Sequence, residues 1–233
     1  MYNNYFENVY SKFWTETSKA YGLEDGVDSI IEILQQLHGE SAFEVGIGTG
    51  WPIADSLLKS GVKMSGCDIS PSLVEQTRKA YPDMDVFAGT IWEAGGGIKK
   101  NGSLQYDIVY CIRSSWYMKD FLRVIQKMLH MTRKNGYVVF NIINRQNQDN
   151  KKALARNRFQ RAKGRIEGAL KVLLLNRDYF ASCPAYYYTK SEIENLLRSM
   201  DVKWKVLSTN QLSDREAKFD ECGQKLLFIV QKL

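Results

Sequence analysis

A three-glycine turn between an apolar strand and a helix constrains this chain more than any other stretch. Residues 43–50 read Phe-Glu-Val-Gly-Ile-Gly-Thr-Gly, and the segment 53–60 that follows has apolar residues at helical spacing. Glycine at every second position allows positive φ and lets the backbone come close to a ligand. The free N–H groups at the start of the following helix would face the same ligand. We therefore expect the turn to hold a nucleotide-like cofactor.

The spacing within the turn argues against two common phosphate-binding patterns. A dinucleotide fingerprint has its third glycine three positions after the second, where this chain has Trp51, and a P-loop has a lysine that this turn lacks. Glu44, Gly46, Gly48 and Gly50 instead resemble motif I of the class I S-adenosylmethionine-dependent methyltransferases. The resemblance implies that Glu44 and the glycine backbone hold the methionine part of S-adenosylmethionine, which becomes S-adenosylhomocysteine as the product.

The composition is that of an ordinary globular protein with one domain. The chain has 233 residues, of which 44% are hydrophobic and 25% are charged. It has no apolar run of about 18 residues that could span a membrane, and no signal peptide pattern at its start. Its four cysteines lack paired or metal-type spacing, and it has two histidines. We therefore expect reduced thiols, a cytoplasmic location and no metal site.

The net charge of +6 is concentrated in one stretch. Segment 145–171 carries nine Lys and Arg residues against two acidic residues, so the rest of the chain is close to neutral. On a helical wheel Arg158, Arg161 and Arg165 form a row beside an apolar side. We expect a helical insertion at 145–185 whose arginines bind an anionic substrate, while a solvated helix face explains the row equally well.

A βαβ unit follows from the strand 41–45, the helix 53–60 and the strand 62–68, and such a unit builds a parallel sheet. Asp68 ends the second of these strands, 22 residues after the first glycine of the turn. An acidic side chain at that edge can accept hydrogen bonds from both ribose hydroxyls. Asp68 and its neighbour Ile69 are therefore assigned to the cofactor, with an N-cap or turn role for Asp68 as the alternative.

The third strand and its exit cover residues 85–92. Similar enzymes place an acidic residue after a glycine here, to contact the adenine amino group. This chain has Thr90 and Ile91 after Gly89, so that contact is in doubt. We expect Thr90, Ile91 and Trp92 to lie at the adenine ring and to cover it by dispersion.

The fourth strand, 106–112, is the clearest strand of the chain, and its exit falls at the edge where open α/β sheets bind ligands. Ile112 is assigned to the cofactor, and Arg113, Trp116 and Tyr117 to the methyl acceptor, with Arg113 and Tyr117 as candidate catalytic residues. The Asn/Asp-Pro-Pro-aromatic motif of many nucleic-acid methyltransferases is absent here. Nucleic acid is therefore not the expected partner.

The remaining elements complete a seven-stranded sheet. We expect helices at 26–39, 72–80, 121–132 and 189–200, a turn at 134–136, and strands at 137–144, 202–208 and 225–233. The last two strands should form an antiparallel hairpin, and Thr189 with Glu192 has the pattern of a capping box.

The sequence thus predicts one α/β domain over residues 1–233. Its fold should be a Rossmann-like doubly wound sheet of seven strands with the last strand antiparallel, an N-terminal helical cap at 1–25 and a helical insertion at 145–185 after the fifth strand. The family resemblance covers about residues 27–144. It leaves both a monomer and a homodimer open.

Methyl transfer from a sulfonium is an in-line displacement, so positioning can supply about 7 to 11 kcal/mol and a general base has a smaller part. An amine acceptor needs only to be neutral, whereas a hydroxyl needs a base. Tyrosines 117, 186, 187 and 188 and the carboxylate of Glu93 are the candidates, and Tyr187 is also assigned to the acceptor.

The expected activity is methyl transfer to nitrogen or oxygen of a small molecule, an anionic or aromatic metabolite or a natural-product intermediate. Two alternatives stay open. One is an RNA or protein methyltransferase that uses the basic insertion, although no recognition domain is appended. The other is a non-catalytic scaffold that binds S-adenosylmethionine.

Overall fold

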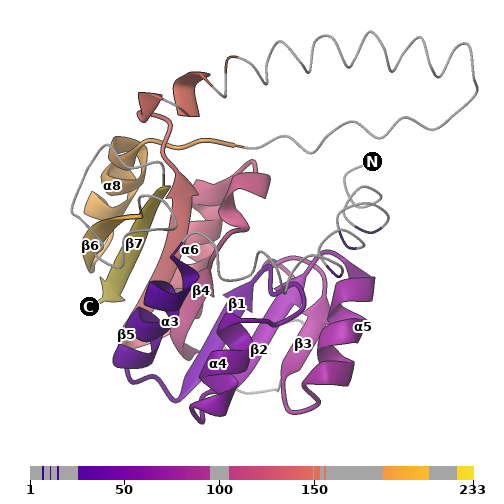
Figure 1. Ribbon diagram of the computed structural model, residues 1–233. Helices are drawn as coiled ribbons and strands as arrows, with labels where there is room; N and C mark the ends of the chain where they lie inside the picture. Colours follow the sequence, from indigo (N-terminus) through magenta and orange to yellow (C-terminus); the bar gives the residue numbers. More distant parts are fainter. Residues whose placement is uncertain are drawn as a thin grey trace, which may run out of the picture.

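The computed structural model describes residues 7, 11, 15, 26–94, 105–148, 150–152, 155, 186–209 and 225–233. Over these ranges the chain forms one seven-stranded sheet in the order β3-β2-β1-β4-β5-β7-β6 (Figure 1). Its strands are β1 (Ser41–Val45), β2 (Lys63–Asp68), β3 (Asp85–Ala88), β4 (Tyr106–Cys111), β5 (Thr132–Ile143), β6 (Val202–Thr209) and β7 (Lys225–Lys232).

The direction of the strands confirms the predicted doubly wound sheet. Strands β1 to β5 pair in parallel, whereas β7 lies antiparallel between β5 and β6. The carboxyl ends of β1 to β5 therefore meet at one edge, at the top of the sheet in Figure 1. Every residue of β4 is buried, as expected for a central strand covered on both faces.

Helices cover both faces of the sheet. They are α3 (Val27–Gln36), α4 (Ile53–Lys59), α5 (Pro71–Ala80), α6 (Phe121–Met131) and α8 (Lys190–Arg198), with a short 3-10 helix η2 (Ser115–Tyr117). Apolar residues of α3 and α4 pack with Ile108 and Val139 of the sheet, on the near face in Figure 1. Residues of α6 and α8 pack with Val138 and Phe140 on the opposite face. The sheet thus separates two apolar cores.

One predicted turn is a bulge inside a strand. The sequence placed a turn at 134–136 and began the fifth strand at residue 137, whereas β5 begins at Thr132. The register jumps there, because Tyr106 of β4 pairs with Thr132 and Ile108 pairs with Tyr137. The side chain of Asp107 opposes the bulge. Its Oδ1 pairs with Arg133, and its Oδ2 accepts hydrogen bonds of 2.9 Å from two backbone N–H groups at the start of β1.

The helix boundaries follow the predicted caps. Ser70 caps α5, where its Oγ accepts from the backbone N of Leu73 at 3.3 Å, and the capping box of Thr189 and Glu192 begins α8. At α4, Pro52 precedes the first helical residue. His38, with φ 50°, takes the left-handed conformation after α3.

The predicted N-terminal cap and the predicted insertion lie mostly outside the described residues. Of the cap, the structure describes Glu7, Ser11 and Thr15. Glu7 Oε2 accepts from Ser70 Oγ at 2.6 Å, and Thr15 Oγ1 donates to Gln76 Oε1 at 3.0 Å. These three cap residues are at helical spacing, and they lie along α5 beside the end of β2. Both the cap and the insertion stay predictions.

Candidate cofactor and acceptor site

The glycine turn leaves β1 and folds back on the end of β2. Gly46, Gly48 and Gly50 have φ angles of 81°, 56° and 76°. The backbone N–H groups of Gly46 and Ile47 both donate to the carbonyl of Cys67, at 2.8 and 3.1 Å. The turn therefore has a left-handed backbone conformation and is bonded to the neighbouring strand. Residues other than glycine adopt this conformation only under strain.

Side chains from two other elements hold this turn from outside. Thr77 of α5 donates its hydroxyl to the carbonyl of Gly48 at 2.7 Å, and Ser114 after β4 donates to the carbonyl of Gly46 at 3.2 Å. A Cβ on Gly46 would lie 2.6 Å from the Cβ of Ser114, closer than real contacts allow. Thr49 Oγ1 is buried with no hydrogen-bond partner in the described part of the chain. The cradle fits a ligand that approaches the bare backbone.

Asp68 joins the end of β2 to the turn. Its Oδ2 accepts from the backbone N of Gly48 and its Oδ1 from the backbone N of Ser70, each at 2.9 Å. Burial raises the pKa of this carboxyl. The bonds from these N–H groups oppose the shift, and the nearby Glu7 carboxylate adds to it. Asp68 therefore braces the turn, as one alternative expected, and lies where ribose hydroxyls are predicted. The ribose contact, like that of the half-buried Ile69, stays a prediction.

Glu44 has a partner inside the sheet. Its side chain is 5% exposed, and the hydroxyl of Tyr110 on β4 donates to Glu44 Oε2 at 2.9 Å. Burial raises the pKa of the Glu44 carboxyl well above its usual range, although the hydrogen bond from Tyr110 opposes the shift. The structure thus gives Glu44 a place beneath the turn in contact with Tyr110. Its predicted contact with the methionine moiety is untested.

The exit of β3 brings an acidic side chain to the place where the sequence showed Thr90. Thr90 Oγ1 donates to Glu93 Oε1 at 3.2 Å, and a Cβ on Gly89 would collide with the Glu93 carboxylate. Ile91 is buried, while Trp92 is 52% exposed with the guanidinium of Arg123 5.7 Å from its ring centroid. From the sequence alone, Glu93 is only a candidate base. Its spacing of three residues from Thr90 is the local signal that a turn can bring the two side chains together.

The exit of β4 is a strained turn. Arg113 has φ 64°, and its backbone N donates to Oδ1 of the buried Asn141 on β5 at 2.8 Å. Ser115 begins η2, and its hydroxyl bonds the backbone carbonyl of Asn141. The half-buried Trp116 and Tyr117 follow, with their ring centroids 6.1 Å apart. The predicted acceptor residues therefore lie together beside the glycine turn, next to the buried Ile112.

Residues 186–188 lie against this exit. The backbone N of Tyr186 donates to the carbonyl of Trp116 at 2.7 Å. The hydroxyl of Tyr188 donates to the carbonyl of Met118 at 2.9 Å and accepts from the backbone N of Phe121 at 3.2 Å. Tyr188 is therefore an anchor of the loop. Tyr187 is half-buried and lies between these two anchored tyrosines in the chain, and its role at the acceptor stays a prediction.

Lys225 is a candidate site residue that sequence reasoning missed. It begins β7 opposite Ile143, so the antiparallel strand returns it to the carboxyl edge of β5. Its Nζ lies 5.3 Å from the centroid of the Trp116 ring, a cation–π contact. The predicted hairpin of β6 and β7 was the available signal, because an antiparallel last strand must start at this edge.

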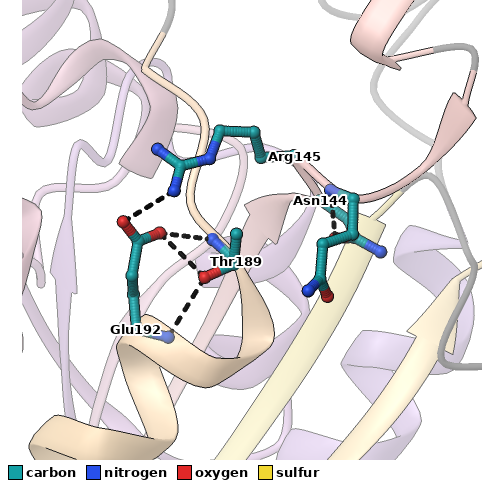
Figure 2. Close-up of polar contacts among 5 residues, drawn as sticks. Asn144, Arg145, Thr189 and Glu192 are labelled. Carbon is teal, nitrogen blue, oxygen red and sulfur yellow. Dashed lines mark hydrogen bonds and ion pairs between the residues drawn. The ribbon is translucent and has the colours of Figure 1, made fainter.

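The ends of the predicted insertion are joined at the sheet (Figure 2). The backbone N of Arg145 donates to the carbonyl of Tyr188 at 2.8 Å, and the guanidinium of Arg145 pairs with Glu192 Oε1 at 2.8 Å. Glu192 Oε2 also accepts from the backbone N of Thr189 at 2.7 Å. Partial burial alone would raise the pKa of Glu192, but the bonds from Thr189 and the charge of Arg145 together lower it. The three arginines predicted to bind substrate, Arg158, Arg161 and Arg165, lie outside the described residues.

The sheet order, the antiparallel β7 and the glycine turn at the carboxyl edge of β1 define the class I S-adenosylmethionine-dependent methyltransferase fold. A family model described as a methyltransferase domain matches residues 19–201, well over half of the chain. The chain therefore belongs to the methyltransferase family, whose cofactor is S-adenosylmethionine.

Curated relatives and solved structures agree with this assignment. The ubiquinone biosynthesis O-methyltransferase of Vibrio cholerae is 24% identical over 144 residues, which cover 60% of this chain and 58% of that protein. The chain thus matches less than two thirds of the length of this relative.

Two solved structures share the fold over almost the whole chain. The magnesium protoporphyrin IX methyltransferase of Synechocystis PCC 6803, with bound S-adenosylhomocysteine, has a TM-score of 0.64, 14% identity and coverage of 100% of this chain and 98% of that one. A methyltransferase of Thermotoga maritima, titled a possible histamine N-methyltransferase, has a TM-score of 0.60, 18% identity and coverage of 96% and 98%.

Two features are absent from the described residues. No helix there is long and apolar enough to cross a bilayer. No group of three or more His, Cys, Asp or Glu side chains is arranged there to hold a metal ion.

Proposed function

We propose that this protein transfers the methyl group of S-adenosylmethionine to a nitrogen or oxygen atom of a small aromatic molecule. The observation that carries the proposal is the contact between Ser114 and Gly46, because it joins the β4 exit to the glycine turn. A methyl donor on the turn and an acceptor at Trp116 and Tyr117 would thus be adjacent. In-line displacement needs this proximity above all.

Residues of the first three strand exits would hold the donor. The turn offers bare backbone at Gly46 and Gly48, and Asp68 places a carboxyl at the end of β2. We assign the adenine contact to Glu93, whose carboxylate lies against Thr90 at the β3 exit. Ile91 would pack against the ring, because it is the buried apolar residue of that turn.

Aromatic side chains favour a planar acceptor. Trp116 and Tyr117 lie at the β4 exit, and Tyr186 and Tyr187 are brought to it by the bond from the Tyr186 backbone to Trp116. Lys225 over Trp116 adds a positive charge at the same edge, which suits an acceptor with an anionic group. The similar proteins include an O-methyltransferase and a possible N-methyltransferase, so the acceptor atom can be either.

Proton removal, where the acceptor is a hydroxyl, would fall to Tyr117. Both histidines of the chain lie elsewhere, since His38 precedes β1 at the amino edge and His130 ends α6. An amine acceptor needs no such group. We also propose a cytoplasmic location and a homodimer.

The first test is binding of S-adenosylhomocysteine by calorimetry, with Asp68→Ala and Asp68→Asn as paired variants. We expect wild-type binding in the micromolar range and a loss of about 100-fold in Asp68→Ala, equivalent to about 2.7 kcal/mol. Asp68→Asn keeps one carbonyl acceptor for Gly48 and should lose less. Equal binding by wild type and Asp68→Ala would contradict the assignment of Asp68.

The second test is transfer of radiolabelled methyl groups from S-adenosylmethionine to a panel of phenols, aromatic carboxylic acids and aromatic amines. We expect label in at least one small aromatic acceptor. Label only in RNA or protein would favour the alternative enzyme class. Binding of S-adenosylmethionine without methyl transfer to a small molecule, RNA or protein would favour the scaffold.

A further inference from the structure

We infer that Asn141 of β5 is a positioning residue for methyl transfer, which holds the β4 exit against the glycine turn. The inference rests on the proposed function and deepens it. Asn141 is 0% exposed and contacts the exit at two points. Its side-chain Oδ1 accepts from the backbone N of Arg113 at 2.8 Å, and its backbone carbonyl accepts from the hydroxyl of Ser115.

The side chain of Asn141 continues the pairing of β4 with β5 beyond the point where the strands part. The last backbone pair between them is Cys111 with Phe140. From there β4 turns away, and the next exposed donor, the N–H of Arg113, bonds to the amide oxygen of Asn141 instead of a backbone carbonyl. The amide therefore determines where the exit turn begins.

The turn that Asn141 holds is one that an arginine adopts at a cost. Arg113 has φ 64°, where the Cβ of an L-residue comes too close to a neighbouring carbonyl. Strained backbone of this kind persists only where the surroundings fix it, and it is concentrated at functional sites. The bond from the Arg113 N–H to Asn141 is the contact that fixes it here.

This turn reaches the donor side through Ser114. Ser114 follows Arg113, donates to the carbonyl of Gly46 at 3.2 Å and fills the space that a Cβ on Gly46 would need. A shift of the Arg113 turn therefore moves Ser114 off the glycine turn. The effect of Asn141 on the cofactor passes through Arg113 and Ser114.

Stability does not account for an amide at this position. Asn141 Nδ2 is buried with no hydrogen-bond partner among the described residues. A buried unpaired donor destabilises the folded state, and an apolar side chain of the same size avoids this penalty. Its neighbours on the same sheet face, Val139 and Leu227, are apolar. Among the described residues the oxygen of the amide is the atom of this side chain that has a hydrogen bond, and its partner is the strained turn.

The test compares Asn141→Leu with wild type in thermal melting and in calorimetric binding of S-adenosylhomocysteine. We expect a melting temperature close to that of wild type, because removal of the unpaired Nδ2 donor offsets the loss of the bond to Arg113. We expect a Kd weaker by about tenfold or more, because the turn is displaced. Leu-variant binding equal to that of wild type would overturn the inference. Absence of binding by wild type would instead contradict the proposed function.

A second variant tests the route through Arg113. Glycine takes positive φ without strain, so Arg113→Gly should make the bond to Asn141 unnecessary. We expect Arg113→Gly and the double variant Arg113→Gly/Asn141→Leu to bind S-adenosylhomocysteine with Kd values within about twofold of each other. The loss caused by Asn141→Leu in the wild-type background would then be absent in the Arg113→Gly background, so the two substitutions would be non-additive. A further loss of about tenfold in the double variant would overturn the inference, even if Asn141→Leu alone failed to fold.

Discussion

The donor side and the acceptor side of the sheet edge are built in different ways. Apart from Ile112, the predicted donor residues come from one continuous stretch, 43–94, in which Asp68 and Thr77 each bond to the glycine turn. The acceptor side brings together the β4 exit, Asn141, residues 186–188 and Lys225, which are far apart in the chain. A donor site can therefore be read from local spacing, whereas an acceptor site depends on tertiary contacts.

The partners also differ in kind. On the donor side most bonds include a backbone group of the turn, such as the N–H of Gly48 or the carbonyls of Gly46 and Gly48. On the acceptor side single residues make two contacts each: the Tyr188 hydroxyl bonds two backbone groups, and Asn141 bonds the β4 exit through its side-chain oxygen and its backbone carbonyl. Substitutions on the two sides should therefore separate binding of the donor from placement of the acceptor.

The largest effect is expected at Gly46. Gly46→Ala puts a Cβ at φ 81° and against Ser114, so strain and collision together should cost about 3 kcal/mol and weaken S-adenosylhomocysteine binding by about 100-fold. Gly61→Ala is the matched control. Gly61 has φ 88° but open space around its Cβ position. Calorimetry should show normal binding by the control and a melting temperature lowered by strain alone. Equal binding by both variants would show that the close approach of Ser114 has no role.

A change of intermediate size is expected beneath the donor site. Glu44→Gln keeps an acceptor for the Tyr110 hydroxyl and removes a carboxyl whose pKa burial raises. A raised folded-state pKa gives stability below the unfolded value of about 4.3 and loses it as pH rises through the folded value. The free energy of unfolding of Glu44→Gln should therefore increase relative to wild type from about pH 4 upward. Chemical denaturation across pH measures this, and a difference that stays constant or falls contradicts it.

The smallest effects are expected at the joined ends of the insertion. Thr189→Ala removes the cap of α8 and should cost about 1 kcal/mol, whereas Arg145→Ala breaks an exposed ion pair and should cost less than about 1 kcal/mol. Both should leave S-adenosylhomocysteine binding unchanged in calorimetry, because neither contacts the donor side. A loss of binding in either variant would show that the two sides are coupled through α8.

Much of the fold could be predicted because its signals are local. The glycine turn, the Ser70-Pro71 helix start and the Thr189 capping box each depend on a few adjacent residues, and the structure confirms the elements they predict. Alternation of apolar residues gave the antiparallel last hairpin. The positions of the donor residues followed from the order of strands.

The parts that could not be predicted depend on contacts across the sheet. The expected turn at 134–136 is instead a bulge within β5. The Asp107 carboxylate pairs with Arg133 there and also accepts a bond from the backbone at the start of β1. In the sequence Asn141 is a polar residue within a predicted strand, and its bond from the Arg113 N–H becomes visible only in the structure. Lys225 needed the register of β7 to bring it to Trp116. No local pattern contains these pairings.

The bond between Arg145 and Tyr188 has a consequence for protein engineering. The chain leaves the sheet edge at Arg145 and is back at Tyr188, where the two backbones are bonded at 2.8 Å and Tyr188 N reaches the carbonyl of Ile143 at 3.3 Å. These fixed attachment points suit the exchange of whole segments, because closure of a longer or shorter loop changes the free energy by only about 0.6 kcal/mol per doubling of length. Residues 146–187 can therefore serve as a replaceable cassette for building chimeric methyltransferases on an unchanged cofactor half.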